Sequence, residues 1–127
     1  MSLPPLLQQH IEALQEMGQK IEVLEDGTKI CIIFKEYVIP KSHWNRTTTD
    51  LMIIAQPAYP NAKLDMFYVL PGMRLADGRV PKAGESEEVH CGKNWQRFSW
   101  HVNNWNPAHD SLITYLNVVD ARLSKKE

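Results

Sequence analysis

The spacing of apolar residues predicts a helix at the start of the chain. Leu7, Ile11 and Leu14 follow one another at intervals of four and three, which places their side chains on one face of a helix. Pro5 suits the first turn, because the first backbone N–H groups of a helix have no partner within it. Gly18 supplies a natural end, because glycine readily adopts the left-handed conformation that follows many helices.

Beyond this helix the apolar period falls to two, which predicts β-strands. Residues 21–25 and 28–37 form the first pair, joined at Asp26-Gly27, a sequence that favours a tight hairpin turn. Two shorter apolar runs, at residues 51–55 and 66–70, predict a third and a fourth strand. Together these runs predict an antiparallel meander of four strands.

Residues 72–94 show little periodicity, and glycine and proline interrupt them repeatedly. So long an irregular segment is uncommon in a small domain and is usually functional where it occurs. A second helix is expected after it, with Asn106 as its cap and Pro107 in its first turn. Its apolar residues recur at intervals of four, three and four, which gives a buried stripe: Leu112, Leu116, Val119 and Leu123. The predicted fold class is therefore α+β, with helices covering an antiparallel sheet.

Composition limits the protein to one domain and excludes several functional classes. The chain has 127 residues, too few for two separate cores, so residues 1–127 are expected to form a single domain. The formal net charge of −1 argues against nucleic-acid binding through bulk charge. The start of the chain lacks a signal-peptide pattern, and no apolar run approaches the roughly 20 residues of a membrane helix. With only two cysteines, a reduced, cytoplasmic setting is the simplest expectation.

Residues with reactive side chains concentrate between positions 90 and 110. Cys91 lies before a glycine, beside His90 and near Lys93, a setting that favours a nucleophilic thiolate. The alternative is an unreactive, partly buried loop cysteine. Cys31 falls in the middle of an apolar strand pattern and is expected to be packed and inert. His101 is a candidate general base or acid, and its structural alternative is a hydrogen bond to a backbone carbonyl.

The same region is rich in tryptophan and histidine. Three of the four tryptophans fall within eleven residues, which predicts either a contact surface or a small satellite core: Trp95, Trp100 and Trp105. The metal-ligating residues match no compact zinc pattern, so no metal site is expected: His90, Cys91, His101 and His109. No nucleotide or cofactor motif is present, and no cofactor is expected.

Several short motifs, taken in order, resemble the ubiquitin-conjugating (UBC) fold. They are Tyr59-Pro60, the strand Phe67-Tyr68-Val69 with Pro71 after it, and the Trp-x-Pro at Trp105-Asn106-Pro107. Residues 95–101, Trp-Gln-Arg-Phe-Ser-Trp-His, more closely resemble the prokaryotic family E of these enzymes, whose strand has a similar Asp-Met-Phe (here residues 65–67). The resemblance spans residues 6–123 and implies a UBC-like domain.

The resemblance implies a component of a bacterial ubiquitin-like protein modification system. The partners that it implies are a ubiquitin-like protein, a ThiF-like activating enzyme and a JAB-type deconjugating peptidase. In the working enzymes of this kind, a loop cysteine takes the C-terminus of the modifier as a thioester and passes it to an amine. No membrane or nucleic-acid partner is expected.

Two forms of this function stay open. In the first, Cys91 accepts the modifier as a thioester, while His101 and Asp110 orient or deprotonate the incoming amine. In the second, the protein is a catalytically inactive scaffold that binds the ubiquitin-like protein or the activating enzyme. Conjugating enzymes place their nucleophile eight residues before the Trp of Trp-x-Pro, where this chain has Arg97, and their His-Pro-Asn motif is absent. The expected binding residues are Trp95, Gln96, Arg97, Ser99 and Trp105.

Overall fold

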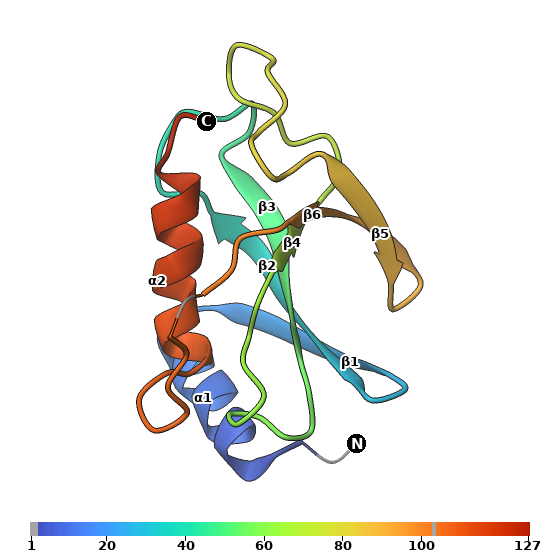
Figure 1. The fold of residues 1–127 in the computed structure, drawn as a ribbon, viewed down its shortest axis with the longest axis vertical. Coiled ribbons are helices and arrows are strands. Elements are labelled where there is room, and N and C mark those ends of the chain that lie inside the picture. The colour runs from blue at the N-terminus through green and yellow to red at the C-terminus, as the bar shows by residue number, and fades with distance from the viewer. Residues whose placement is uncertain (1–2, 103) are drawn as a thin grey trace.

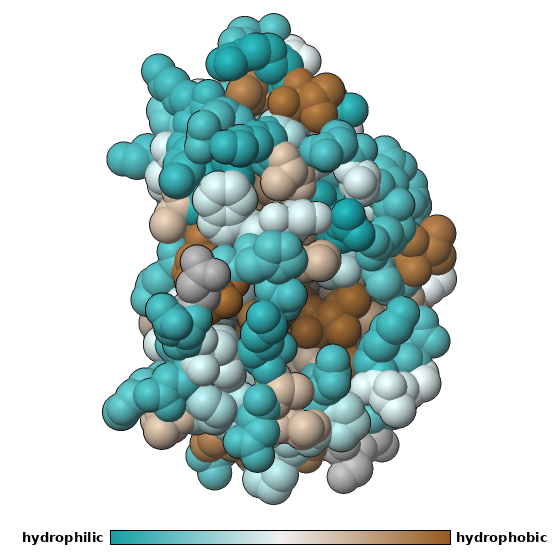
Figure 2. Space-filling view, in the orientation of Figure 1, coloured by the Kyte–Doolittle hydropathy of each residue, from teal (hydrophilic) through white to brown (hydrophobic). Residues whose placement is uncertain are grey.

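The computed structural model describes residues 3–102 and 104–127, which form one sheet with two helices on the same side of it (Figure 1). In chain order the elements are α1 (Pro5–Glu16), β1 (Lys20–Asp26), β2 (Lys29–Val38), β3 (Thr48–Ala55), β4 (Phe67–Val69), β5 (Ser86–His90), β6 (Lys93–Phe98) and α2 (Leu112–Leu123). The surface seen from this side is largely polar, with separate apolar patches (Figure 2). Scattered patches of this kind are normal for a folded domain.

All six strands pair in an antiparallel manner, in the order β1-β2-β3-β4-β6-β5. The first four strands form the predicted meander, and β1 turns into β2 between Asp26 and Lys29. The predicted strand number of four is wrong, because β5 and β6 extend the sheet beyond β4. The α+β class is confirmed.

The hairpin of β5 and β6 takes up the end of the segment predicted to be irregular, residues 86–94 of 72–94. His90 pairs with Lys93 across a two-residue turn at Cys91 and Gly92, whose φ angles are 50° and 75°. Turns with two positive φ angles match the twist of antiparallel strands and favour tight hairpins. In the edge strand β5 only His90 is buried, and the strand contains two glutamates and an exposed valine, so the apolar alternation is missing.

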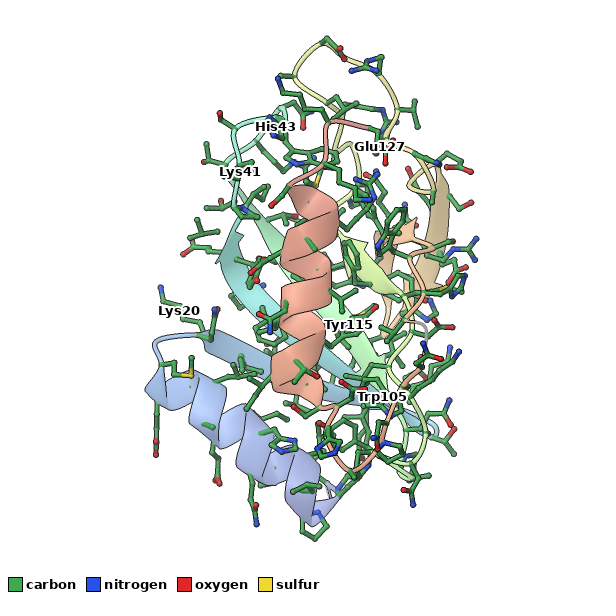
Figure 3. The ribbon with its side chains drawn as sticks, turned by 60° about the vertical axis from the view of Figure 1, so that its left-hand side comes forward. Lys20, Lys41, His43, Trp105, Tyr115 and Glu127 are labelled. Carbon is green, nitrogen blue, oxygen red and sulfur yellow. The ribbon has the colours of Figure 1, made fainter. Side chains whose placement is uncertain are left out.

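The inner face of the sheet forms the main core beneath both helices. Figure 3 shows α2 lying across this face. The ring of Phe67 on β4 stacks on that of Phe98 on β6, with centroids 4.9 Å apart. The two helices and β2 contribute the apolar stripes that the sequence predicts: Leu7, Ile11, Leu14, Ile30, Ile32, Phe34, Leu112, Leu116, Val119 and Leu123.

The C-terminal helix begins five residues later than predicted, at Leu112 instead of Pro107. Ser111 is its cap, and the Ser111 side chain accepts hydrogen bonds from the backbone N–H groups of Ile113 and Thr114 (3.1 and 3.4 Å). Asn106 instead caps a separate short turn before the helix. Asn106 and Pro107, the pair expected to begin the helix, therefore begin this turn.

Candidate functional site

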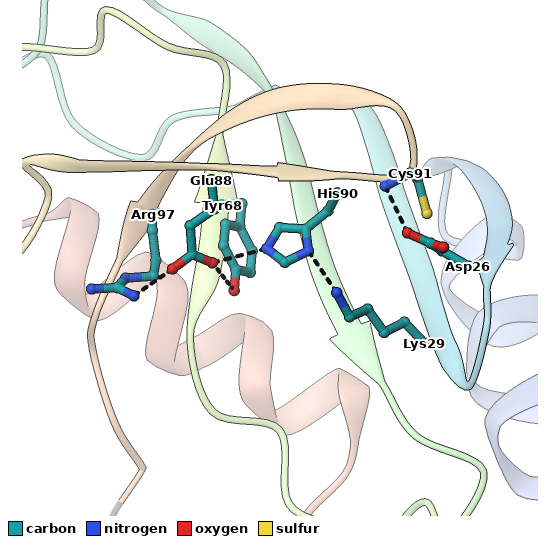
Figure 4. Close-up of polar contacts among 7 residues, drawn as sticks. All are labelled: Asp26, Lys29, Tyr68, Glu88, His90, Cys91 and Arg97. Carbon is teal, nitrogen blue, oxygen red and sulfur yellow. Dashed lines mark hydrogen bonds and ion pairs between the residues drawn. The ribbon is translucent and has the colours of Figure 1, made fainter.

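A chain of polar contacts crosses the outer face of the sheet, the face turned away from the helices (Figure 4). Glu88 and His90 on β5 lie on the same face as Arg97 on β6, because alternate residues of paired strands point the same way. Tyr68 is the register partner of Arg97 in the β4–β6 pair and so joins them. These side chains border a second, smaller apolar cluster: Cys31, Ile33, Met52, Tyr68 and Trp95.

Glu88 is the centre of this chain of contacts. One of its carboxylate oxygens accepts a hydrogen bond from Arg97, and the other accepts from His90 Nε2 (2.9 Å) and from the Tyr68 hydroxyl (3.3 Å). The hydrogen bond from His90, together with the hydrogen bond and the charge of Arg97, holds the pKa of Glu88 below its ordinary value against the opposing effect of burial. Burial raises the pKa of Tyr68 to about 12, and the Glu88 charge adds to this shift. At neutral pH, Glu88 is therefore a carboxylate and Tyr68 a protonated donor.

Lys29, at the start of β2, contacts the opposite side of the His90 ring. Its Nζ donates a hydrogen bond to His90 Nδ1 (3.3 Å). An ammonium group has donors only, so Nδ1 is the unprotonated ring nitrogen and Nε2 bears the hydrogen that Glu88 accepts. The two contacts together assign the tautomer and the orientation of His90, whose side chain is 10% exposed.

A groove of about 410 Å³ lies beside Lys29 and His90. It combines apolar side chains with two lysines and an aspartate. Its lining residues are Thr28, Lys29, Ile54, Gln56, Lys63, Asp65, Met66, Tyr68 and His90. A concave site of this size with a few polar groups suits a small ligand or one extended chain end.

Cys91 lies at the tip of the β5–β6 hairpin and is partly exposed. Its backbone N–H donates to the Asp26 carboxylate (3.4 Å), and its side chain packs against the second apolar cluster, which contains Cys31. Burial raises the pKa of the Cys31 thiol to about 12, and the neighbouring Cys91 adds to the shift. Both thiols are free, but only Cys91 is accessible to solvent.

His101 lies beyond the other end of β6. Its Nδ1 donates to the Asp65 carboxylate (2.7 Å), and 52% of its side chain is exposed. Because Cys91 precedes β6 and His101 follows it, about 20 Å of strand separates the two residues. The structure therefore does not bring these two candidates together.

Asp110 and Trp105 hold the short turn before α2. The Asp110 carboxylate accepts hydrogen bonds from the Asn106 backbone N–H (2.8 Å) and from the Thr114 hydroxyl (3.4 Å). Trp105 donates from its indole N–H to the carbonyl of Pro60 (2.8 Å), and its ring lies near the N-terminal end of α2 (Figure 3). The carboxylate of Asp110 is thus engaged by its own turn.

Gln96 links β6 to the preceding loop. Its side-chain amide is buried, accepts from the backbone N–H of Met73 (2.8 Å) and donates to the carbonyls of Met73 (3.0 Å) and Gly84 (2.8 Å). The backbone N–H of Ser99 binds the same loop (2.9 Å). Trp95, next to Gln96, is 1% exposed and belongs to the outer apolar cluster.

Of the residues predicted for the site, the β5–β6 hairpin places Cys91, Trp95 and Arg97 on the outer face of the sheet. His101 and Asp110 lie beyond the hairpin, in the segment that leads to α2. The assignment of roles to these residues stays a prediction.

Lys29, Tyr68 and Glu88 were not predicted to belong to a site. The alternation of Glu88 and His90 about Val89 is the one local signal for their shared face, because alternate strand residues point the same way. Lys29 has no such signal. It reaches His90 only because the twist of the sheet carries the hairpin tip back over the start of β2.

Within residues 3–102 and 104–127, no group of three or more His, Cys, Asp or Glu side chains is arranged to hold a metal ion. No helix in the described part of the chain is long and apolar enough to cross a bilayer.

An N-terminal helix, an antiparallel sheet, a Trp-x-Pro turn and a second helix are consistent with an E2-like domain. The family model described as Prokaryotic E2 family E matches residues 6–126, nearly the whole chain. The protein therefore belongs to prokaryotic E2 family E, which confirms the resemblance seen in its motifs. No curated protein and no solved structure matches the chain.

Proposed function

We propose that this protein is the E2-like component of a prokaryotic ubiquitin-like modification system and acts in it as a binding scaffold. Its partners are the ubiquitin-like protein and the ThiF-like activating enzyme, in a system that also contains a JAB-type peptidase. The family match over residues 6–126 is the observation that supports this role. The proposal places the protein in the cytoplasm, where cysteines stay reduced.

Three placements support the scaffold form over a thioester carrier. Arg97, at the position where the resemblance expects the nucleophile, is ion-paired with Glu88. His101, a candidate base, lies at the far end of β6 from Cys91. Asp110 is engaged by backbone and side-chain donors of its own turn.

The second candidate function is thioester transfer through Cys91. Its support is that Cys91 is the partly exposed cysteine and occupies a hairpin tip, whereas Cys31 is fully buried. A thiol at such a tip can reach a partner's C-terminus without rearrangement of the core. In this form the hairpin takes the role that the active-site loop has in conjugating enzymes.

A reconstituted reaction separates the two functions. The protein is incubated with its activating enzyme, the ubiquitin-like protein and ATP, and the products are run on a non-reducing gel with and without thiol. The scaffold form predicts stable association and no thiol-sensitive covalent band, both in the wild type and in Cys91→Ala. A thiol-sensitive band that is lost in Cys91→Ala and kept in the matched control Cys31→Ala would establish thioester transfer instead.

A further inference from the structure

We propose that Lys29 is an acylation site, at which the ε-amine accepts an acyl group from a thioester with His90 as its proton acceptor. The inference goes beyond the proposed function and does not depend on it, because any acyl thioester could supply the group. It rests on the directed contacts from Lys29 through His90 to Glu88 and on the groove beside them.

The hydrogen bonds along these contacts run in the direction that is needed to remove a proton from an amine. Lys29 Nζ donates to the unprotonated Nδ1 of His90, and Nε2–H of the same ring donates to the Glu88 carboxylate. A carboxylate on the far nitrogen orients the imidazole and stabilises the imidazolium that forms when Nδ1 takes a proton. Glu88 is in turn held by Arg97 and by the Tyr68 hydroxyl, so the ring has a fixed support.

The groove provides a place for the acyl group next to this amine. Lys29 is an exposed residue, and its neighbours in the groove include the apolar side chains of Ile54 and Met66. An acyl chain can lie against these side chains while its carbonyl carbon faces Lys29. Lys63 lines the same groove and supplies a second positive charge. Positive charge near the carbonyl favours the oxyanion that forms during attack.

The reaction forms one bond and breaks one. The ammonium of Lys29 gives a proton to His90 Nδ1, and the neutral amine then attacks the thioester carbonyl carbon. The new N–C bond forms as the C–S bond breaks and the thiolate leaves. The nitrogen loses two protons in all. His90 accepts them in turn and passes the first to water and the second to the thiolate, which leaves as a thiol. The products are an amide at Lys29 and a free thiol.

In the part of the chain that the structure describes, no other lysine side chain is hydrogen-bonded to a histidine. Lys35 is bound to the Asp50 carboxylate (2.8 Å), which raises the pKa of its ammonium and keeps it protonated. Lys20 is paired with Glu36 (3.6 Å) on an exposed surface. Lys63 shares the groove with Lys29 and is therefore the internal control for access of the reagent.

The test uses the purified protein and a small acyl thioester, S-acetyl-N-acetylcysteamine, with no other protein present. After limited reaction near neutral pH, peptide mass spectrometry measures the acetylated fraction of each lysine. Acetylation of Lys29 is expected to be at least about tenfold faster than that of Lys63, a conservative share of the rate that a positioned base supplies. In His90→Gln the two lysines should react at rates within about twofold of each other, while the remote control His43→Gln should keep the difference.

Equal rates at Lys29 and Lys63 in the wild type would overturn the proposal. So would an undiminished Lys29 rate in folded His90→Gln. If His90→Gln does not fold, Glu88→Gln decides, because it removes the carboxylate that supports the imidazolium and should slow Lys29 relative to Lys63. If Lys29 is not acetylated faster than Lys63, the proposed binding role of the protein still stands, because no partner takes part in this assay.

Discussion

The two faces of the sheet differ in what their side chains do. On the inner face, Phe67 stacks on Phe98 beneath the helices, and its neighbours are almost all apolar. On the outer face the very next residue, Tyr68, donates to Glu88 within a chain of charged groups. The inner face, with the larger apolar cluster, is expected to contribute more to stability, and the outer face carries the linked polar groups. Substitutions on the two faces should therefore have separable effects.

The largest effect is expected from Phe67→Ala on the inner face. The substitution removes a fully buried ring from a stacked pair and should lower the free energy of unfolding by about 3–5 kcal/mol. Tyr68→Phe on the same strand removes one hydroxyl contact and should cost about 1 kcal/mol. Urea denaturation of both variants measures the difference, and equal losses would contradict the division between the faces.

A smaller loss is expected from Gln96→Leu. Its side chain makes three hydrogen bonds to backbone groups of Met73 and Gly84, and leucine would leave these groups without their partner. Each unpaired buried polar group costs about 1–3 kcal/mol, and partial access of water to the loop should keep the total to about 2–4 kcal/mol. Hydrogen exchange should show faster opening of residues 72–84. Unchanged exchange there would mean that Gln96 does not hold the loop.

The outer face should respond to pH through Glu88. Its pKa is lowered in the folded protein, first by the hydrogen bond from His90 and then by Arg97, so the folded state favours the carboxylate. The resulting stabilisation is present above the ordinary pKa of 4.5 and is lost as the pH falls through the lower, folded-state pKa. The stability difference between wild type and Glu88→Gln should therefore shrink on acidification from near neutral pH. The control Glu85→Gln, at an exposed position, should show no such change, and a constant difference for Glu88→Gln would refute the assignment.

The two thiols give the mildest test of the comparison, because Cys91 is partly exposed at the hairpin tip whereas Cys31 is fully buried in the outer apolar cluster. Cys91 should react with a disulfide reagent in the native protein, whereas burial and a pKa of about 12 should slow Cys31 by at least about 100-fold. Cys91→Ser retains only Cys31 and Cys31→Ser retains only Cys91. Labelling each variant under native and unfolding conditions therefore measures the rate of each cysteine separately. Similar native rates for the two cysteines would show that the hairpin does not shield β2.

The inner face could be predicted from the sequence because its signal is periodic. Leu7, Ile11 and Leu14 repeat at helical spacing, and the strand residues beside Cys31 alternate, so the core follows from local rules. The helix start at Leu112, with Ser111 as its cap, differs from the predicted one because the Asn106-Pro107 pair is also a good start for a turn.

The outer face could be predicted only in part. The sequence identifies Cys91 and Arg97 as residues with reactive side chains, but the residues that surround them depend on strand pairing. Lys29 and His90 are 61 positions apart and meet only because the edge hairpin folds over β2. The edge strand β5 has two glutamates and no buried apolar residue, so the apolar pattern does not reveal the element that assembles this face.

Isothermal titration calorimetry with the ubiquitin-like protein and with the activating enzyme tests the proposed scaffold function most directly. The wild-type protein is predicted to bind at least one of them, and Cys91→Ala is predicted to bind with the same Kd within about twofold, a difference below 0.5 kcal/mol, about what a surface substitution costs. Folded wild-type protein that binds neither partner, or binding that is lost only in Cys91→Ala, would contradict it.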